Sequence, residues 1–141
     1  MKKLLLLSAL LIFACSSDEG NNSTLTFLEK YNGVVWEEDN GSIFTITFFE
    51  NPPAWRTSLD ENFDGVNCGY YIFGEENPDY HMEIIEMFED EIVFSYVDYI
   101  DFSSFDITFT VENSGNTLRA SRNIDSEIYY YERTNLTNPC D

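Results

Sequence analysis

Side chains that could bind a cation follow one another at short spacing near the middle of the chain. Asp60, Asn62 and Asp64 alternate with other residues and are followed by Gly65, which matches the first half of a calcium-binding loop. Oxygen ligands on a tight turn can surround a hard cation, and the glycine permits the bend. The twelfth loop position should be a bidentate glutamate, and here it is Tyr71. We therefore favour an acidic hairpin turn over a calcium site, and predict no other cofactor.

The only histidine and the many acidic residues do not identify a catalytic centre. His81 lies in the alternating segment 80–84, which puts it on the polar face of an expected strand. A catalytic triad would need it beside a nucleophile and an acid. Two carboxylates can hydrolyse a glycan, but 26 acidic residues make any one pair uninformative. We predict that the protein is not an enzyme, and keep a glycan-acting envelope enzyme as the last alternative.

The first fifteen residues have the layout of an export signal. Lys2 and Lys3 form a basic start, residues 4–13 form an apolar run interrupted by one serine, and Ala14 precedes Cys15. This pattern is typical of a signal peptide. The run is too short for a membrane-spanning helix, which needs about 20 apolar residues.

The junction formed by Ile12, Ala14 and Cys15 resembles a bacterial lipobox. The resemblance implies that residues 1–14 are removed and that Cys15 is lipidated. The alternative is an ordinary signal peptide that contains a cysteine. Residues 15–23 then form a flexible polar linker to an outer-membrane anchor in the cell envelope. Residues 17–19, Ser-Asp-Glu, resemble the surface-export signal of Bacteroidota lipoproteins, so display on the cell surface and a solvated periplasmic linker both stay open.

The two other cysteines, Cys68 and Cys140, form an even pair once Cys15 is assigned to the lipid. In an exported domain such a pair predicts a disulfide, here one that ties the C-terminal tail to the middle of the chain. Closing a loop of about 70 residues is worth about 4 kcal/mol in the chain-entropy model. Two free thiols are the alternative.

The composition excludes several classes of partner. Removal of residues 1–14 takes away two lysines and no acids, so the net charge deepens from −19 to −21. A chain this acidic is not expected to bind nucleic acid, or to touch anionic lipid except through its own anchor. Aromatic residues make up 16% of the chain, which excludes disorder and requires a core or a pocket.

Turn signals recur about every 11–13 residues, and the segments between them are rich in β-branched and aromatic residues. This spacing predicts an antiparallel barrel or sandwich. The clearest alternation puts Phe105, Ile107, Phe109 and Val111 on one face of a strand. Residues 40–41, Asn-Gly, predict a tight hairpin. We expect strands at 34–39, 42–50, 54–59, 66–73, 79–88, 91–99, 105–113, 116–123 and 127–133.

One short helix is expected before the first strand. Ser23 or Thr24 can cap it, and Leu25, Leu28 and Tyr31 mark its apolar side. An Asn-Gly pair, which tolerates positive φ, ends it. We see one domain, spanning residues 24–141.

The helix, the Gly-Val-Val-Trp segment at residues 33–36, the following antiparallel strands and the C-terminal cysteine together resemble the lipocalin-like domains of bacterial lipoproteins. The resemblance implies an all-β, up-and-down barrel of eight or nine strands after one short helix. It also implies that Trp36 plugs one barrel end, and it fits a disulfide between Cys140 and Cys68. A β-sandwich without a cavity is the structural alternative.

A small barrel can hold one ligand in its interior. The leading functional hypothesis is a non-enzymatic lipoprotein that binds a small apolar ligand, and the second is a surface-displayed acidic module that binds an envelope protein. The same aromatic residues could instead simply fill a core. The candidate ligand-binding residues are Trp36, Phe44, Ile46, Phe48, Tyr71, Phe73, Phe94, Tyr96, Phe109 and Tyr130, with Met82, Ile84, Phe105 and Ile107 on the same strand faces.

Overall fold

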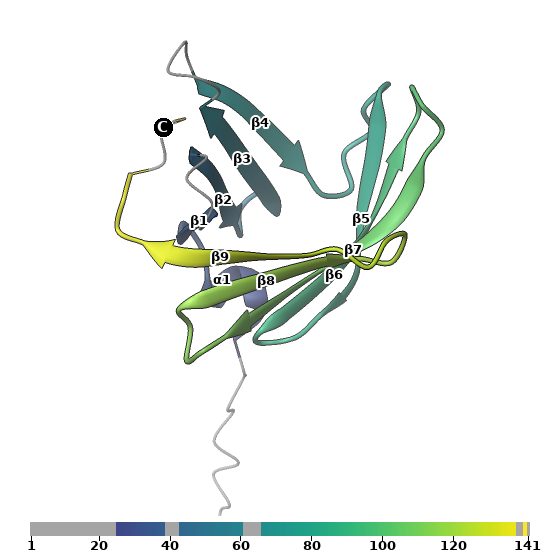
Figure 1. Cartoon of the computed structure of the whole chain (residues 1–141). Helices are drawn as coiled ribbons and strands as arrows, with labels where there is room; N and C mark the ends of the chain where they lie inside the picture. The colour runs from purple at the N-terminus through teal and green to yellow at the C-terminus, as the bar shows by residue number, and fades with distance from the viewer. Residues whose placement is uncertain (1–24, 39–42, 61–65, 138–139, 141) are drawn as a thin grey trace, which may run out of the picture.

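The computed structural model describes residues 25–38, 43–60, 66–137 and 140, which form one short helix and nine strands (Figure 1). Every strand end lies within one residue of its expected position. The elements are α1 (Phe27–Lys30), β1 (Val35–Glu38), β2 (Ile43–Phe49), β3 (Ala54–Asp60), β4 (Val66–Ile72), β5 (Tyr80–Met87), β6 (Glu91–Asp98), β7 (Ser104–Glu112), β8 (Thr117–Arg122) and β9 (Ile128–Thr134).

The strands form a single antiparallel sheet that curls into a nearly closed barrel, in the order β4-β3-β2-β1-β9-β8-β7-β6-β5. The expected up-and-down barrel is thereby confirmed against the sandwich. The first and last strands pair with each other, from Val35 opposite Thr134 to Glu38 opposite Tyr131. The seam of the barrel therefore lies in the middle of the chain, between β4 and β5.

The seam follows from the number of strands. Because every neighbouring pair is antiparallel and there are nine strands, β4 and β5 run in the same direction. Parallel neighbours need a crossover of about a dozen residues or more, and only residues 73–79 connect these two strands. Figure 1 shows this link running from the arrowhead of β4 to the start of β5. The Gly74 amide donates to the Met82 carbonyl at 2.7 Å, and the rings of Tyr71 and Tyr80 meet at 5.4 Å.

One end of the barrel is covered by α1, and we call it the plugged end. Phe27, Leu28 and Tyr31 of this segment are buried. The Phe27 ring lies 5.0 Å from Phe48 and the Tyr31 ring 5.8 Å from Trp36, which is completely buried. Helix and strands thus share one aromatic core at this end.

The cap of α1 is Thr26, so the expectation that Ser23 or Thr24 caps it is wrong. The Glu29 amide donates to Thr26 Oγ1 at 3.4 Å, and Glu29 Oε2 accepts from the Thr26 amide at 2.6 Å. This reciprocal capping box satisfies two amides that the helix cannot satisfy itself. It also shifts the register, so that Leu25 is 52% exposed and Phe27 takes the buried place. Ser23 and Thr24 themselves lie outside the described residues.

The predicted disulfide between Cys68 and Cys140 is present, with 5.9 Å between the two Cα atoms. Cys68 lies on β4 opposite Ser58, which is opposite Thr45, and both of these side chains are buried on the outer side of the sheet. Their hydroxyl oxygens lie 2.6 Å apart in a hydrogen bond. Arg56 on β3 also donates to the Cys140 carbonyl at 3.4 Å. Two links therefore hold the C-terminal residues against the β3–β4 half of the barrel.

Several sequence predictions lie outside the described residues. They concern the signal segment 1–14, Cys15, the linker 15–23, the Asn-Gly hairpin at 40–41, and Asn62 and Asp64 of the calcium-loop match. For Asp60 only the backbone is described, as the last residue of β3.

Candidate functional site

A cavity of about 350 Å³ opens inside the barrel at the end opposite α1, which we call the open end. Phe44 and Phe105 lie near the starts of β2 and β7, while Arg122 ends β8. Because neighbouring strands alternate in direction, these positions meet at one end of the barrel. The lining residues are Phe44, Ile46, Trp55, Tyr71, Tyr96, Phe105, Ile107, Phe109, Ala120, Ser121, Arg122, Tyr129 and Tyr131.

The structure divides the sequence-predicted ligand residues between the cavity and the core. Those that line the cavity are Phe44, Ile46, Tyr71, Tyr96 and Phe109, together with Phe105 and Ile107. Trp36, Phe48, Phe94 and Met82 are fully buried and fill the core. Phe73 packs against Phe94 at 5.0 Å, and Ile84 packs against the edge of the same core.

The expectation that Tyr130 lines the interior is wrong. Its side chain is 49% exposed, and its neighbours Tyr129 and Tyr131 line the cavity instead. Side chains alternate along a strand, so a shift of one residue exchanges the two faces. Three tyrosines in a row carry no hydrophobic alternation that could settle the face from sequence.

Six lining residues were missed: Trp55, Ala120, Ser121, Arg122, Tyr129 and Tyr131. The register explains two of them, because Phe109 lies opposite Ala120 and Ala120 opposite Tyr129. Cross-strand neighbours on one face share an environment. The inward face of β7 was recognised from sequence, so extending it across the pairing would have found both.

Aromatic rings form most of the wall. The Trp55 ring lies 5.4 Å from Tyr71 and 5.7 Å from Phe109. The Tyr96 ring lies 5.3 Å from Phe105. Aromatic contacts at these separations are attractive beyond their buried area and give stiff, flat walls.

Gly69 makes room for one of these rings. A Cβ at Gly69 would lie 2.7 Å from the Tyr71 ring and 2.8 Å from Thr57 Oγ1. The Tyr71 side chain therefore lies back along β4 over the glycine, which brings it to the cavity although its backbone is near the far end of the strand. An aromatic ring that covers a glycine on an edge strand also stabilises the pairing of that strand.

The charged lining residue is Arg122, and its charge is matched locally. Its Nη2 lies 2.5 Å from Asp125 Oδ2 and 3.8 Å from Glu127 Oε2, and the guanidinium lies over the Phe105 ring at 5.6 Å. The Tyr129 hydroxyl donates to Glu127, and this bond raises the tyrosine pKa. Because two carboxylates surround one guanidinium, the cluster carries a net negative charge at neutral pH.

A second tyrosine of the cavity wall, Tyr96, is hydrogen-bonded to the carboxylate of Asp98, which follows it on β6. The Tyr96 hydroxyl donates to Asp98 Oδ2 at 3.2 Å, and burial followed by this bond raises the pKa of Tyr96 to about 12. Burial also raises the pKa of Tyr131, with a further contribution from the charge of Glu38. These hydroxyls therefore stay protonated at neutral pH.

Two donors in the lining residues have no hydrogen-bond acceptor within the part of the chain that the structure describes. They are the indole N–H of Trp55 and the Nε–H of Arg122, both of which are shielded from solvent. The indole N–H of Trp36, in the core, is likewise buried and has no acceptor among the described residues. A buried donor without an acceptor is unfavourable by about 1–3 kcal/mol.

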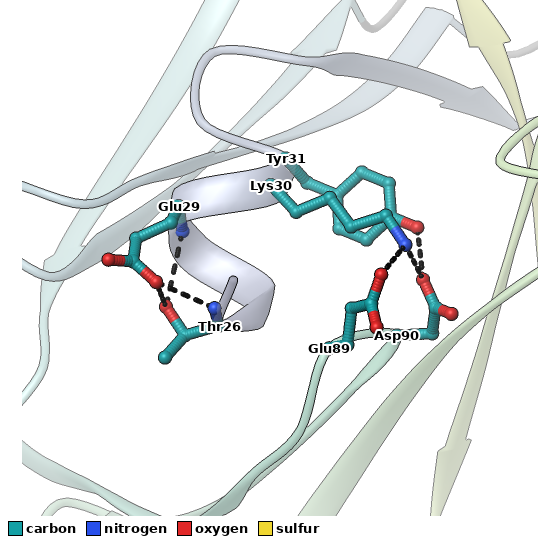
Figure 2. A network of polar contacts seen from close by, with 6 residues as sticks. All are labelled: Thr26, Glu29, Lys30, Tyr31, Glu89 and Asp90. Carbon is teal, nitrogen blue, oxygen red and sulfur yellow. Dashed lines mark hydrogen bonds and ion pairs between the residues drawn. The ribbon is translucent and has the colours of Figure 1, made fainter. Parts of the chain in front are cut away.

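The plugged end carries a different polar arrangement, on its outside (Figure 2). Lys30 Nζ lies 2.7 Å from Glu89 Oε1 and 2.8 Å from Asp90 Oδ1, and the Tyr31 hydroxyl donates to the same Asp90 oxygen at 2.5 Å. Lys30 and Tyr31 lower the pKa of Asp90. These bonds tie α1 to the turn between β5 and β6. A polar hollow of about 400 Å³ beside them is lined by Lys30, Tyr31, Asp90, residues 111–115 and Arg133.

The described residues carry little that suits metal or acid–base chemistry. They contain no group of three metal-binding side chains. His81 borders a surface hollow of about 330 Å³ with Glu76, Asn77 and Tyr99. The cavity lining includes no Asp, Glu, His or Cys, so this wall offers apolar contact, the Arg122 guanidinium and the hydroxyls of Ser121 and four tyrosines.

No helix within the described residues has the length and apolar character needed to cross a membrane. No protein-family model, curated protein sequence or solved structure matches this chain.

Proposed function

We propose that this protein is a non-enzymatic, lipid-anchored protein of the cell envelope, of the lipocalin-like kind, that holds a small apolar ligand inside its barrel. The observation that carries the proposal is the cavity at the open end. Its volume of about 350 Å³ lies in the range of small-molecule sites, about 300–1,000 Å³.

The cavity argues against a barrel that serves only as a structural core. Protein interiors are close-packed, and voids larger than a water molecule are few. The plugged end follows this rule, since Trp36, Phe27 and Phe48 are fully buried there. At the open end, rings as large as Trp55 and Tyr71 border open space. Apolar wall left unfilled in this way is recovered as favourable burial when a ligand enters.

The proposed anchor and the cavity lie at opposite ends of the barrel. The chain enters the fold at α1, on the plugged end, while the cavity opens at the other end. A linker from Cys15 to Leu25 spans at most about 35 Å when fully extended. A lipid on Cys15 would therefore tether the barrel at its plugged end and leave the open end unobstructed by the linker.

A second candidate function, binding of an envelope protein, is favoured by the loop between β6 and β7. Ile100 is 72% exposed and Phe102 is 88% exposed, at a φ of 61°. The loop is nevertheless well tied: Asp98 Oδ1 accepts from the Ile100 amide at 2.7 Å and from the Asp101 amide at 3.1 Å. A pre-ordered loop that presents apolar side chains suits a binding surface.

Tryptophan fluorescence tests the cavity directly. The chain has two tryptophans, so Trp36→Phe leaves Trp55 in the wall as the reporter. The chain carrying Cys15→Ser is expressed without the proposed signal segment 1–14, so that neither a lipid nor the apolar run 4–13 requires detergent, and is titrated with N-phenyl-1-naphthylamine. We expect saturable energy transfer from Trp55 to the dye.

A matched pair of variants supplies the control. Ala120→Leu fills the wall and should abolish the energy transfer, whereas Tyr130→Phe on the outer face should leave it unchanged. Binding that persists in Ala120→Leu, or an absence of binding in the parent, would contradict the proposal. Native mass spectrometry of the chain from its own envelope addresses the second candidate, through a co-purifying protein that is lost with Phe102→Ser and kept with Ala120→Leu.

A further inference from the structure

We infer that the cavity selects neutral ligands that carry a hydrogen-bond acceptor, such as a ketone, ester or ether oxygen on an apolar ring system, and that it discriminates against anionic amphiphiles. This inference rests on the proposed ligand binding and specifies the chemistry of the ligand. It follows from the charge, the committed hydroxyls and the unpaired donors of the wall.

The charge of the wall is the first step. Arg122 is the one basic side chain among the lining residues, and it is the natural partner for a ligand carboxylate. Its Nη2 is already paired with Asp125 and lies close to Glu127. A ligand carboxylate would have to share the guanidinium with both of these like charges, in a place that water only partly screens.

The rest of the rim adds negative charge. The Asp98 carboxylate accepts from the Tyr96 hydroxyl at the edge of the cavity. The chain as a whole has a formal net charge of −19. An approaching anion is therefore repelled at the mouth as well as at Arg122.

Two of the four tyrosine hydroxyls in the wall do not compensate, because each already donates its proton. A hydroxyl can stabilise an anion only by donating its proton. The Tyr129 hydroxyl already donates to Glu127 and the Tyr96 hydroxyl to Asp98. Both groups are thereby left with lone pairs, which accept hydrogen bonds and repel anions.

The unpaired donors supply the positive part of the inference. Trp55 Nε1–H and Arg122 Nε–H lack an acceptor among the described residues, and both residues belong to the wall. Both groups are shielded from solvent, so a ligand oxygen meets them only if the side chains of Trp55 and Arg122 turn toward the cavity. A neutral acceptor satisfies a donor there without adding a charge to the acidic cluster.

Three naphthalenes of similar size separate these effects. They are 2-acetylnaphthalene, which has a neutral acceptor, 2-ethylnaphthalene, which has none, and 2-naphthoate, which is an anion. Each is used to displace N-phenyl-1-naphthylamine at pH 7 from the same Cys15→Ser chain, which lacks the signal segment 1–14. We expect 2-acetylnaphthalene to bind at least tenfold more tightly than 2-naphthoate, and several-fold more tightly than 2-ethylnaphthalene.

The outcomes distinguish this inference from the proposed function. Equal or tighter binding of 2-naphthoate overturns the inference while ligand binding stands. Equal binding of the acetyl and ethyl compounds overturns the acceptor part. If neither the dye nor any naphthalene binds, the proposed function fails and the inference falls with it.

Variants assign the selectivity to named residues. Asp125→Asn with Glu127→Gln frees the guanidinium of Arg122, and should strengthen 2-naphthoate binding at least tenfold while 2-acetylnaphthalene changes less than threefold. Glu83→Gln with Glu86→Gln removes the same charge from exposed positions on β5 and should change neither. An equal gain in both double variants would show a general charge effect and overturn the role of the cluster.

A last variant tests the indole donor. Trp55→Phe keeps an aromatic wall and removes the N–H group. It should weaken 2-acetylnaphthalene several-fold and leave 2-ethylnaphthalene unchanged. Parallel losses for the two ligands would show that Trp55 contributes shape alone.

Discussion

The two ends of the barrel are built from the same kinds of residue and have opposite organisation. At the plugged end, α1 lies over the core, and Phe27, Trp36 and Phe48 are completely buried. At the open end, Phe44, Phe105 and other rings border a cavity of about 350 Å³. Aromatic content by itself therefore does not make a ligand site. What differs is whether another element of the chain fills the space between the rings.

The ion pairs at the two ends of the barrel also have different roles. At the plugged end, Lys30 and Tyr31 converge on Asp90 outside the core, and the bonds fasten the helix. At the open end, Arg122 of the cavity wall is drawn into pairs with Asp125 and Glu127. The first arrangement supports packing, whereas the second determines which charges the cavity tolerates.

The largest expected effect comes from exchanging the two tryptophans, one in the filled core of the plugged end and one in the cavity wall. Trp36→Ala removes a fully buried side chain, and should lower the free energy of unfolding by about 3–5 kcal/mol. Trp55→Ala enlarges an existing cavity and creates no new one. It should therefore lower the free energy of unfolding by about 2 kcal/mol, which is the hydrophobic transfer free energy of the lost side chain. Urea unfolding followed by circular dichroism measures both. Equal losses would show that the open end is packed as tightly as the plugged end.

Gly69→Ala tests how the open end keeps its shape. The added Cβ would overlap the Tyr71 ring and Thr57 Oγ1, so we expect a loss of about 1–3 kcal/mol and displacement of the ring. Dye binding should weaken together with stability.

A double-mutant cycle provides the control for Gly69. In a Tyr71→Ala background the same substitution should be much less destabilising, because most of the overlapping atoms are gone. Additive losses in the two backgrounds would place the strain elsewhere.

Thr26→Ala breaks the capping box of α1 and should destabilise the protein by about 1 kcal/mol. Glu29→Ala removes the other half of the same box, so the two losses should be less than additive. Because α1 belongs to the plugged end, dye binding at the open end should stay unchanged. A change in dye affinity would show that the two ends are coupled.

The smallest effect concerns the pH dependence of the plugged end. Lys30 and Tyr31 lower the pKa of Asp90 below its ordinary 3.8, so the stabilisation is present above that value and is lost as the pH falls through the lowered pKa. The pair is largely exposed, which limits its contribution to below about 1 kcal/mol. Wild type and Asp90→Asn should therefore differ in urea midpoint at pH 7 and converge near pH 2–3. A difference that persists at low pH would mean that Asp90 acts through packing.

Much of the fold was predictable because its signals are local. Turn residues at regular spacing and alternation such as that of Phe105 and Ile107 gave each strand end to within one residue. The helix was expected in the right place, with the wrong cap. The capping box of Thr26 and Glu29 is itself a local pattern that could have corrected it.

The site was predictable only in part. Phe44, Tyr71 and Phe109 were expected to line a cavity, and they do. Trp36 and Phe94 carry the same apolar signal and lie in the core instead. Sequence gives the face of the strand on which a side chain lies, and the position along the barrel axis comes from pairing across strands.

The sequence by itself determined the class of fold, the strands and the cysteine pair, because alternation, turn residues and residue count act over short distances or need no geometry. Only the tertiary structure decided where the barrel is plugged, where its seam lies and which rings border space. Those features depend on contacts between distant segments: β1 pairs with β9, α1 covers one end, and Arg122 meets the acids of the loop between β8 and β9. The chemistry expected of the cavity follows from these contacts, which no single segment contains.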